Sequence, residues 1–483
     1  MTIRVYDTMR DQTVDFGTRD PGKVGMYACG MTVYNYAHIG NMRTIVWFDF
    51  IRRYLEYRGF DVTFVMNYTD VDDKIIERSR IEGIPTDAVT AKYIAAFEQD
   101  LSDLGADVPD IVPRATTHIA EMIDAIQGLI DRGFAYEAEG NVWFDVEKFS
   151  DYGKLSGRSL DDMRAGEERI EPDPSKRNPL DFGLWKIAKE DEPSWDSPWG
   201  PGRPGWHIEC SVMSTKYLGT GFDIHGGGSD LIFPHHENEI AQTEALTGET
   251  FSRYWLHAGM VQMETEKMSK SLGNVVLAHE VLKHYPGEAV RYWMFQSSYR
   301  SQAVFSGDAL SDATQSYDRW KTFLEGARHV LADDLPKPRD HYVRSDDGDD
   351  GELATGYVQR FIDTMDDDFN SAEAFAVLHE LVREGNKFLD QAQRNDEQAR
   401  NDLISSAETF LELTAVLGFD FAAGPADSKL AAGLIELLLE LRDQAREEKA
   451  FDRADAIRAR LLDLGVSIED TPAGTRWRLS AGA

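Results

Sequence analysis

Two cysteines are the only thiols of the chain, and both stand near other metal-ligating side chains. Cys29 ends an apolar run, Cys210 closes Gly-Trp-His-Ile-Glu-Cys, and Pro-His-His-Glu-Asn-Glu begins at residue 234. If Pro234 is the first helical residue, the third segment presents an imidazole and a carboxylate four residues apart on one helix face. A tetrahedral zinc site can then be assembled from Cys29, Cys210, His235 and Glu239. The alternative is two buried free thiols beside a polar helix start.

Two further segments suit the binding of phosphate. His-Ile-Gly-Asn at 38–41 follows the first apolar run and enters a helix, whose N-terminus offers free N–H donors and a positive dipole end. Gly40 permits close backbone approach, while His38 and Asn41 supply donors. Lys267 and Lys270, in Lys-Met-Ser-Lys-Ser, would neutralise charge on a leaving pyrophosphate. The alternatives are a surface histidine and a solvated basic patch.

The scaffold for these residues is predicted to be α/β. Residues 23–30 and 61–67 are short apolar strands, and 44–59 between them has apolar side chains at helical spacing with a glycine stop. The strand pattern returns at 219–228 and 254–264. A parallel, Rossmann-like sheet is therefore expected, with ligands at the carboxyl ends of its strands.

The chain is predicted to contain four parts. Residues 1–114 and 201–307 form the sheet domain, and 115–200, rich in Asp, Glu, Pro and Gly, form an insertion. Residues 308–423 are nearly all helical in pattern and form a helical bundle. Residues 424–483 form a small last domain.

Composition restricts the function class. The chain has 483 residues, 85 acidic against 51 basic, and a net charge of −34. Such acidity argues against a nucleic-acid partner, but the carboxylates are dispersed along the whole chain, which is typical of a protein that works in concentrated salt. An ordinary acidic enzyme is the alternative. No signal peptide or membrane span is expected, and two cysteines in 483 residues favour a reducing cytoplasm.

Taken together, the segments resemble the class I aminoacyl-tRNA synthetases, and within them the cysteinyl-tRNA synthetases. HIGN at 38–41 is similar to the class signature HIGH, with Asn41 in place of the last histidine, and KMSKS at 267–271 matches the second signature. YACGMTVYNYAHIGN, NYTDVDDKI, RPGWHIECS and DIHGGGSDLIFPHHENEIAQ resemble the cysteine branch. The resemblance extends over nearly the whole chain.

The resemblance implies a cytoplasmic, monomeric enzyme that activates cysteine with ATP and Mg²⁺ and esterifies it to tRNA(Cys). One zinc ion would be held by Cys29, Cys210, His235 and Glu239 and would select the substrate thiol. The remaining implied roles are ATP binding by His38, Gly40, Asn41, Gly227, Asp230, Lys267 and Lys270, with His38, Asn41 and the two lysines catalytic. Cysteine would be bound by Cys29, Thr69 and Trp206, and His207, His225 and His236 would surround the metal.

Three other functions remain open. A cysteine ligase acting on a small amino-sugar acceptor would share the sheet, zinc and ATP motifs, but it would not need the last 160 or so residues. A zinc hydrolase is suggested by the His-His-Glu-Asn-Glu segment, although four protein ligands leave no general base for a metal-bound water. A non-catalytic RNA-binding protein is disfavoured by the intact KMSKS segment.

Overall fold

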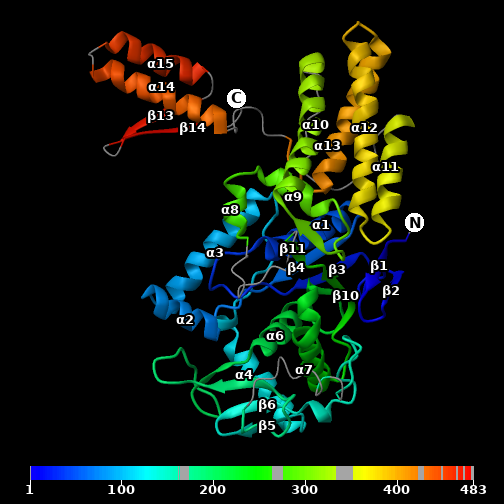
Figure 1. Cartoon of the computed structure of the whole chain (residues 1–483), viewed down its shortest axis with the longest axis vertical. Helices are drawn as coiled ribbons and strands as arrows, with labels where there is room; N and C mark the ends of the chain where they lie inside the picture. The colour runs from blue at the N-terminus through cyan, green and yellow to red at the C-terminus, as the bar shows by residue number, and fades with distance from the viewer. Residues whose placement is uncertain are drawn as a thin grey trace. The chain divides into compact units, whose positions relative to one another are not determined.

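The computed structural model describes residues 2–160, 163, 173–263, 276–332, 352–421, 429–447, 450–463, 466–471 and 474–479. The chain forms two compact units, Met1–Phe419 and Asp420–Ala483, which are described separately below. Both are drawn in Figure 1.

A four-stranded parallel sheet is the centre of the first unit. Its order is β10 (Ser252–Ala258), β9 (Phe222–Gly228), β3 (Lys23–Ala28) and β4 (Asp61–Met66). The helix α1 (Ile39–Tyr57) connects β3 to β4. The predicted α/β class with a parallel sheet and a helical C-terminal region is confirmed. Because the strands are parallel, the loops after β3, β4 and β9 emerge at the same edge of the sheet.

The helix α1 is buried along most of its length. Trp47, Phe50 and Tyr54 are each 0 % exposed and recur at helical spacing, which explains why this segment is helical and where it packs. His38 is the residue before the helix, and its Nδ1 atom accepts a hydrogen bond from the backbone N–H of Asn41, 3.1 Å away. The His-Ile-Gly-Asn segment thus forms the helix start that the sequence predicts.

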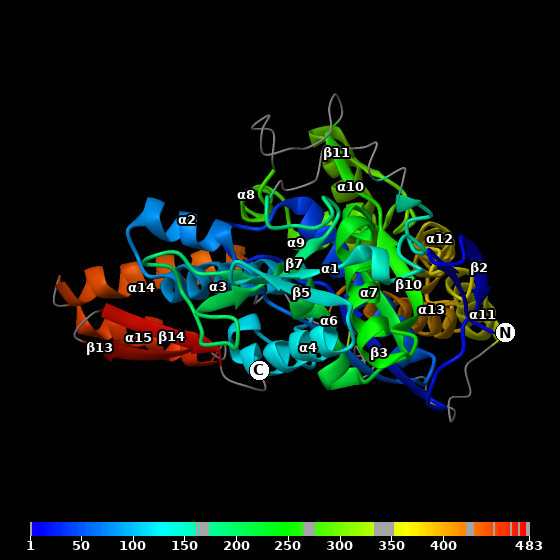
Figure 2. The same cartoon turned by 90° about the horizontal axis from the view of Figure 1, so that it is seen from below.

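An antiparallel sheet lies in the inserted segment. Its strands are β5 (Ala135–Ala138), β6 (Asn141–Phe144), β7 (Phe182–Ile187) and β8 (Gly202–Pro204), preceded by α4 (Ile119–Asp131). This sheet shares one hydrophobic core with α6 (Trp206–Leu218) and α7 (Glu237–Thr247). In both views α4 lies beside β5 and beside α6 (Figures 1 and 2). The shared core fixes the insertion against the two helices that follow it.

Other elements complete the first unit. They are β1 (Arg4–Asp7), β2 (Gln12–Asp15), α2 (Asp73–Glu82), α3 (Thr86–Asp103), β11 (Val261–Met263), β12 (Ala303–Phe305), α8 (Ala278–Leu282), α9 (Gly287–Phe295), α10 (Gly307–Leu331), α11 (Glu352–Met365), α12 (Ser371–Ala392) and α13 (Glu397–Val416). Arg291 of α9 links this helix to α1 and to the end of α13. It pairs with Asp49 of α1 at 2.9 Å and donates to the carbonyl of Leu417, the residue after α13. This buried contact connects the sheet domain to the helical region.

The second unit contains α14 (Lys429–Glu447), α15 (Phe451–Asp463) and the hairpin of β13 (Val466–Thr471) with β14 (Gly474–Leu479). Its core contains Ile435, Leu439, Leu461 and Val466. In the part of the chain that the structure describes, no helix is both long and apolar enough to cross a membrane.

Candidate metal centre and adjoining cavity

Four ligand side chains meet beneath the carboxyl edge of the sheet. The ligand atoms of Cys29, Cys210, His235 and Glu239 all lie within 4.8 Å of one another, and all four residues are buried. Cys29 follows β3, Cys210 is on α6, Glu239 is on α7, and His235 is in a distorted helical turn, η5 (Ile232–His236). Three segments distant in the sequence therefore contribute to one cluster.

The helix start at Pro234 agrees with the prediction. Within η5 only Phe233 has non-helical, extended backbone angles, so the backbone is helical from Pro234 through η5 into α7, which begins at Glu237. His235 and Glu239 are therefore about one helical turn apart and face each other. Their Nε2 and Oε1 atoms are 3.1 Å apart.

The distances within the cluster fit a tetrahedral metal ion. The Cys29 Sγ atom is 3.5 Å from His235 Nε2 and 3.4 Å from Glu239 Oε1. A zinc ion with bonds of about 2.3 Å to sulfur and about 2.0–2.2 Å to nitrogen or oxygen separates its ligand atoms by about 3.3–3.8 Å. Burial raises the pKa of the Cys29 and Cys210 thiols, so thiolates here require a cation beside them. The donor set therefore suits a divalent ion.

Neighbouring rings hold His235 in place. His207 Nδ1 is 2.8 Å from His235 Nδ1, which leaves the Nε2 atom of His235 directed at the cluster. Trp206 stacks on the His235 ring with centroids 4.1 Å apart. Burial lowers the pKa of His207 to about 3 and lowers the pKa of His235 well below its ordinary value. Both rings are therefore neutral, as a metal-binding imidazole must be.

Two more histidines lie behind the cluster. His225 Nε2 is 3.6 Å from Cys29 Sγ, and His236 Nδ1 is 2.8 Å from His257 Nε2. The Nδ1 atom of His257 is in turn 2.7 Å from the Thr8 hydroxyl. The imidazoles expected around a metal are thus gathered beside the cluster of Cys29, Cys210, His235 and Glu239.

A cavity of about 390 Å³ opens beside the cluster at the carboxyl edge of the sheet. The residues that line it include Cys29, Thr32, Tyr34, His38, Gly40, Asn41, Thr44, Trp206, Gly228 and Asp230. Burial lowers the pKa of His38, against the opposing effect of Asp230, so its imidazole is neutral at pH 7. The cavity combines the N-terminus of α1 with hydrogen-bonding side chains, an arrangement suited to an anionic ligand.

Several predicted site residues lie elsewhere. Gly227 is not among the residues that line this cavity. Its Cα faces the ring of His236, and an added Cβ would lie 3.1 Å from that ring. Thr69 is buried one layer behind the wall, where its hydroxyl donates to Glu209 Oε2 at 2.9 Å. Lys267 and Lys270 lie outside the described residues.

Two residues that sequence reasoning missed support the cluster. Asn67, after β4, accepts the backbone N–H of Gly30 at 3.0 Å, and its Oδ1 atom is 3.6 Å from Cys210 Sγ. Gly30 must be glycine there, because a Cβ would lie 1.7 Å from the carbonyl oxygen of Asn67. Glu209 is 1 % exposed and binds Thr69. A polar residue that ends a buried strand is the sequence signal that points to Asn67.

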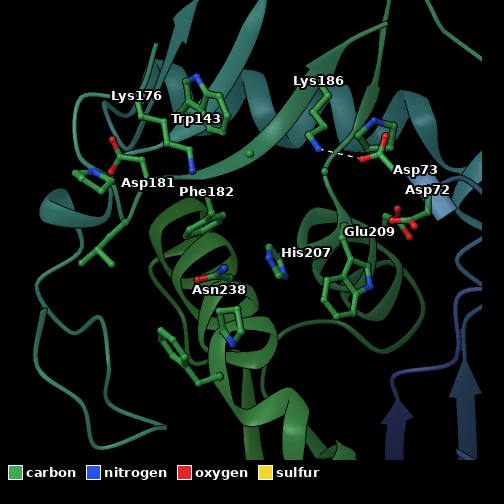
Figure 3. Close-up of a pocket in the computed structure, with 18 of the residues that line it drawn as sticks. Asp72, Asp73, Trp143, Lys176, Asp181, Phe182, Lys186, His207, Glu209 and Asn238 are labelled. Carbon is green, nitrogen blue, oxygen red and sulfur yellow. Dashed lines mark hydrogen bonds and ion pairs between the residues drawn. The ribbon is translucent and has the colours of Figure 1, made fainter. Parts of the chain in front are cut away.

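A second cavity, of about 560 Å³, lies between the inserted sheet and α6. Figure 3 shows Lys176 and Trp143 on one side and His207, Glu209 and Asn238 on the other. Its wall also includes Arg158, Lys186 and Arg203, although Lys186 pairs with Asp73 at 3.1 Å. Trp206 lines both cavities, so its indole lies between them.

The chain matches three known domain families. Residues 15–315 match the class I (C) tRNA synthetase catalytic domain, residues 360–422 the DALR domain, and residues 432–478 the anticodon binding domain of cysteinyl-tRNA ligase. Among solved structures, methionyl-tRNA synthetase from Mycobacterium tuberculosis in complex with methionyl-adenylate is 16 % identical, with a TM-score of 0.58. The match covers 82 % of this chain and 89 % of that one and shows a shared fold.

Relatives of high identity match from end to end. The cysteine–tRNA ligase of Carboxydothermus hydrogenoformans is 47 % identical over 480 residues, which cover 99 % of this chain and 100 % of the relative. The cysteine–tRNA ligase of Desulfitobacterium hafniense is 48 % identical over 487 residues, with the same coverage. The chain therefore belongs to the cysteine–tRNA ligase family of the class I tRNA synthetases.

Proposed function

We propose that this chain activates L-cysteine with ATP and transfers the cysteinyl group to tRNA(Cys). The observation that carries the proposal is the position of Cys29, which belongs both to the metal-binding cluster and to the wall of the 390 Å³ cavity. A substrate side chain in that cavity can therefore approach the cluster. At the same time its carboxylate can face the helix start at His38.

Cys29, Cys210, His235 and Glu239 would hold one zinc ion per chain. When bound, zinc prefers a thiolate to an alcohol and so supplies the discrimination of cysteine from serine, which a pocket of ordinary shape provides only weakly. Trp206 would close the substrate pocket over the His235 ring. Thr69 would act indirectly, since Glu209 holds it behind the wall.

ATP, together with Mg²⁺, would be bound by residues at the start of α1, at or just after the end of β9 and in the Lys-Met-Ser-Lys-Ser segment. His38, Gly40 and Asn41 would contact the phosphates at the N-terminus of α1, where the positive end of the helix dipole favours an anion. The Asn41 side chain can still donate a hydrogen bond, so the change from HIGH to HIGN preserves a donor. Gly227 and Asp230 would face the adenosine, and Lys267 with Lys270 would neutralise the departing pyrophosphate.

In the first step the cysteine carboxylate attacks the α-phosphate, forming cysteinyl-adenylate and releasing pyrophosphate. In the second step the terminal ribose hydroxyl of tRNA attacks the adenylate carbonyl, and AMP leaves. We infer that the tRNA end enters through the 560 Å³ cavity, because that cavity adjoins the first at Trp206 and carries Arg158 and Lys176 in an otherwise acidic chain. Positioning of the reactants supplies most of the rate.

The division of labour proposed for the chain follows the predicted boundaries. Catalysis and contacts with the tRNA stem would belong to residues 1–114 and 201–307, with 115–200 as a connective insertion and 308–423 as a helical bundle. Anticodon recognition would belong to 424–483. The anticodon-binding match over 432–478 favours tRNA over a small amino-sugar acceptor. A cytoplasmic location and a monomeric state complete the proposal.

The test is the attachment of radioactive cysteine to tRNA by the purified full-length protein. We expect acid-precipitable cysteine that depends on ATP and on tRNA(Cys), and that is absent when the tRNA 3′ end has been oxidised with periodate. Cysteine activation without any transfer to tRNA would favour the small-acceptor ligase. The absence of both reactions would contradict the proposal.

A further inference from the structure

A second set of ligand atoms overlaps the metal-binding cluster. The ligand atoms of Cys29, His225, His236 and Glu239 also lie within 4.8 Å of one another, and all four residues are buried. The second set shares Cys29 and Glu239 with the first. It replaces one thiol and one imidazole with two imidazoles that the proposed reaction does not use.

The separations in the second set resemble those around a tetrahedral ion. Cys29 Sγ is 3.6 Å from His225 Nε2, and His225 Nε2 is 3.3 Å from Glu239 Oε2. His236 Nε2 is 3.9 Å from Glu239 Oε1. The two distances to His225 Nε2 fall within the range of about 3.3–3.8 Å set by zinc bond lengths. The 3.9 Å separation exceeds this range by about 0.1 Å and involves the other oxygen of Glu239. The side chains of each set would therefore have to move little to coordinate an ion.

The two oxygens of Glu239 face different partners. Oε1 is the atom close to Cys29 and His235 in the first set. Oε2 is turned toward His225 and, among the described residues, has no hydrogen-bond partner. The Nε2 atom of His236 is also buried without a partner in this part of the chain. Buried polar atoms are rarely left unsatisfied, and a cation between these two atoms would satisfy both.

His236 is held as a metal-binding histidine is usually held. Its Nδ1 atom is 2.8 Å from His257 Nε2, and Thr8 fixes the far nitrogen of His257. His207 holds the Nδ1 atom of His235 in the same way in the first set. In His235 and His236 alike, one ring nitrogen is bound to a neighbour and the other is directed at the cluster, whereas the Nδ1 atom of His225 has no hydrogen-bond partner among the described residues.

If His225 and His236 only oriented Glu239, the geometry of the His236 ring would be unexplained. A ring that only oriented Glu239 would hydrogen-bond to it, but the 3.9 Å between His236 Nε2 and Glu239 Oε1 is too long for a hydrogen bond. Nor do His225 and His236 line the 390 Å³ cavity, whereas Cys29 does. The pair therefore forms a separate, deeper group around the shared thiol.

We propose that Cys29, His225, His236 and Glu239 form a second position for a thiophilic divalent ion such as Zn²⁺ or Co²⁺, independent of Cys210 and His235. An ion there is set back from the cavity. Metal content and cysteine activation are consequently separable, and a chain that lacks Cys210 still retains one ion.

Cobalt binding tests this directly. Cys29 and Cys210 are the only cysteines, so in Cys210→Ser every thiolate-to-cobalt charge-transfer band reports Cys29. The full-length variant, freed of metal with a chelator, is titrated with Co²⁺ and read in the near ultraviolet. We expect one equivalent to bind with a single-thiolate band, although cysteine activation is lost.

Two double variants identify the position. Cys210→Ser with His236→Gln should bind Co²⁺ about 10–100-fold more weakly than Cys210→Ser alone, because a ligand is lost. Cys210→Ser with His235→Gln is the matched control, since His235 is the adjacent buried histidine and lies outside the second set. It should bind within about threefold of the single variant.

Three results decide the outcome. Dependence of the band on His236 and not on His235 supports the second position. Dependence on His235 would place the ion in the first position and overturn the proposal, as would a folded Cys210→Ser chain that gives no thiolate band. Circular dichroism establishes folding, and Cys210→Ala provides a second background if the serine variant does not fold.

Discussion

The Nδ1 atoms of His207 and His235 lie 2.8 Å apart, so one of these rings must donate its hydrogen to the other. With His235 Nε2 directed at the cluster, His235 donates from Nδ1 and His207 accepts. His207 therefore sets the tautomer and the orientation of a metal-binding ring without touching the cluster itself.

Replacing His207 should consequently weaken cysteine selection but not ATP binding. His207→Leu should raise the KM for cysteine by about 10–100-fold in pyrophosphate exchange, since the ring of His235 loses its partner. The KM for ATP should stay within about twofold, because His207 does not line the 390 Å³ cavity. His207→Asn, which retains an acceptor, should recover part of the loss. A parallel rise of both KM values would show only a general disturbance of the site.

The proposed role of the Lys-Met-Ser-Lys-Ser segment in pyrophosphate release can be tested with a matched pair of substitutions. Lys270→Ala should slow adenylate formation by about a hundredfold or more, the cost of losing one cation from a transition-state charge clamp. Lys283→Ala is the control, because its side chain is 59 % exposed and pairs with the exposed Glu280. Single-turnover release of pyrophosphate measures both. Equal rates for the two variants would remove Lys270 from the chemistry.

The candidate site residues that follow the parallel strands could be predicted from the sequence. Cys29 and His38 follow an apolar strand, and such a position predicts a site at the sheet edge whatever the rest of the fold. The contacts of His207 with His235 and of Asn67 with Cys210 could not be predicted, because they join residues 28 and 143 positions apart whose packing no local pattern describes.

The helix start at Pro234 could be predicted because it depends on local chemistry: proline has a helical φ, and the backbone is helical from Pro234 on, after the extended Phe233. The surroundings of Gly227 could not be predicted, because tertiary packing places the His236 ring beside its Cα.

The buried carboxylate of Asp49 should be a strong contributor to stability. It pairs with Arg52 at 3.0 Å and with Arg53 and Arg291 at 2.9 Å each. Asp49→Asn removes this charge partner from the buried Arg291, while Arg52 and Arg53 still pair with Asp107. The substitution should reduce the free energy of unfolding by about 3–5 kcal/mol in urea. Asp61→Asn, at an exposed pair 3.9 Å long, is the control and should change it by about 0.5 kcal/mol or less.

The same carboxylate predicts a pH dependence. Burial alone would raise the pKa of Asp49, but Arg53, Arg291 and Arg52 outweigh it and lower the pKa to about 2 from 3.8. Its stabilisation, about 2 kcal/mol from this shift, is therefore complete above about pH 4 and is lost as the pH falls toward 2. The stability difference between the native chain and Asp49→Asn should narrow over that interval. A difference that stays constant from pH 5 to pH 2.5 would contradict the assignment.

Removal of residues 425–483 should separate the two half-reactions. Every described residue assigned to metal, cysteine or ATP lies in the first unit, so pyrophosphate exchange should persist. Charging should weaken through a higher KM for tRNA, because the removed segment includes the anticodon-binding match. Steady-state charging with varied tRNA measures the effect. A truncated chain that charges tRNA as efficiently as the full chain would favour a small acceptor.

The central claim is that the cluster at Cys29 selects a thiol substrate during activation. Its most direct test is pyrophosphate exchange by the zinc-loaded, full-length protein, with cysteine and serine compared at equal concentrations. A thiolate and a hydroxyl differ far more as zinc ligands than as occupants of an ordinary pocket, which rejects a near-isostere only about a hundredfold. We predict exchange with cysteine that exceeds exchange with serine by more than about a thousandfold, and a ratio that collapses in Cys29→Ser. Comparable exchange with the two amino acids, or none with cysteine, would contradict the account.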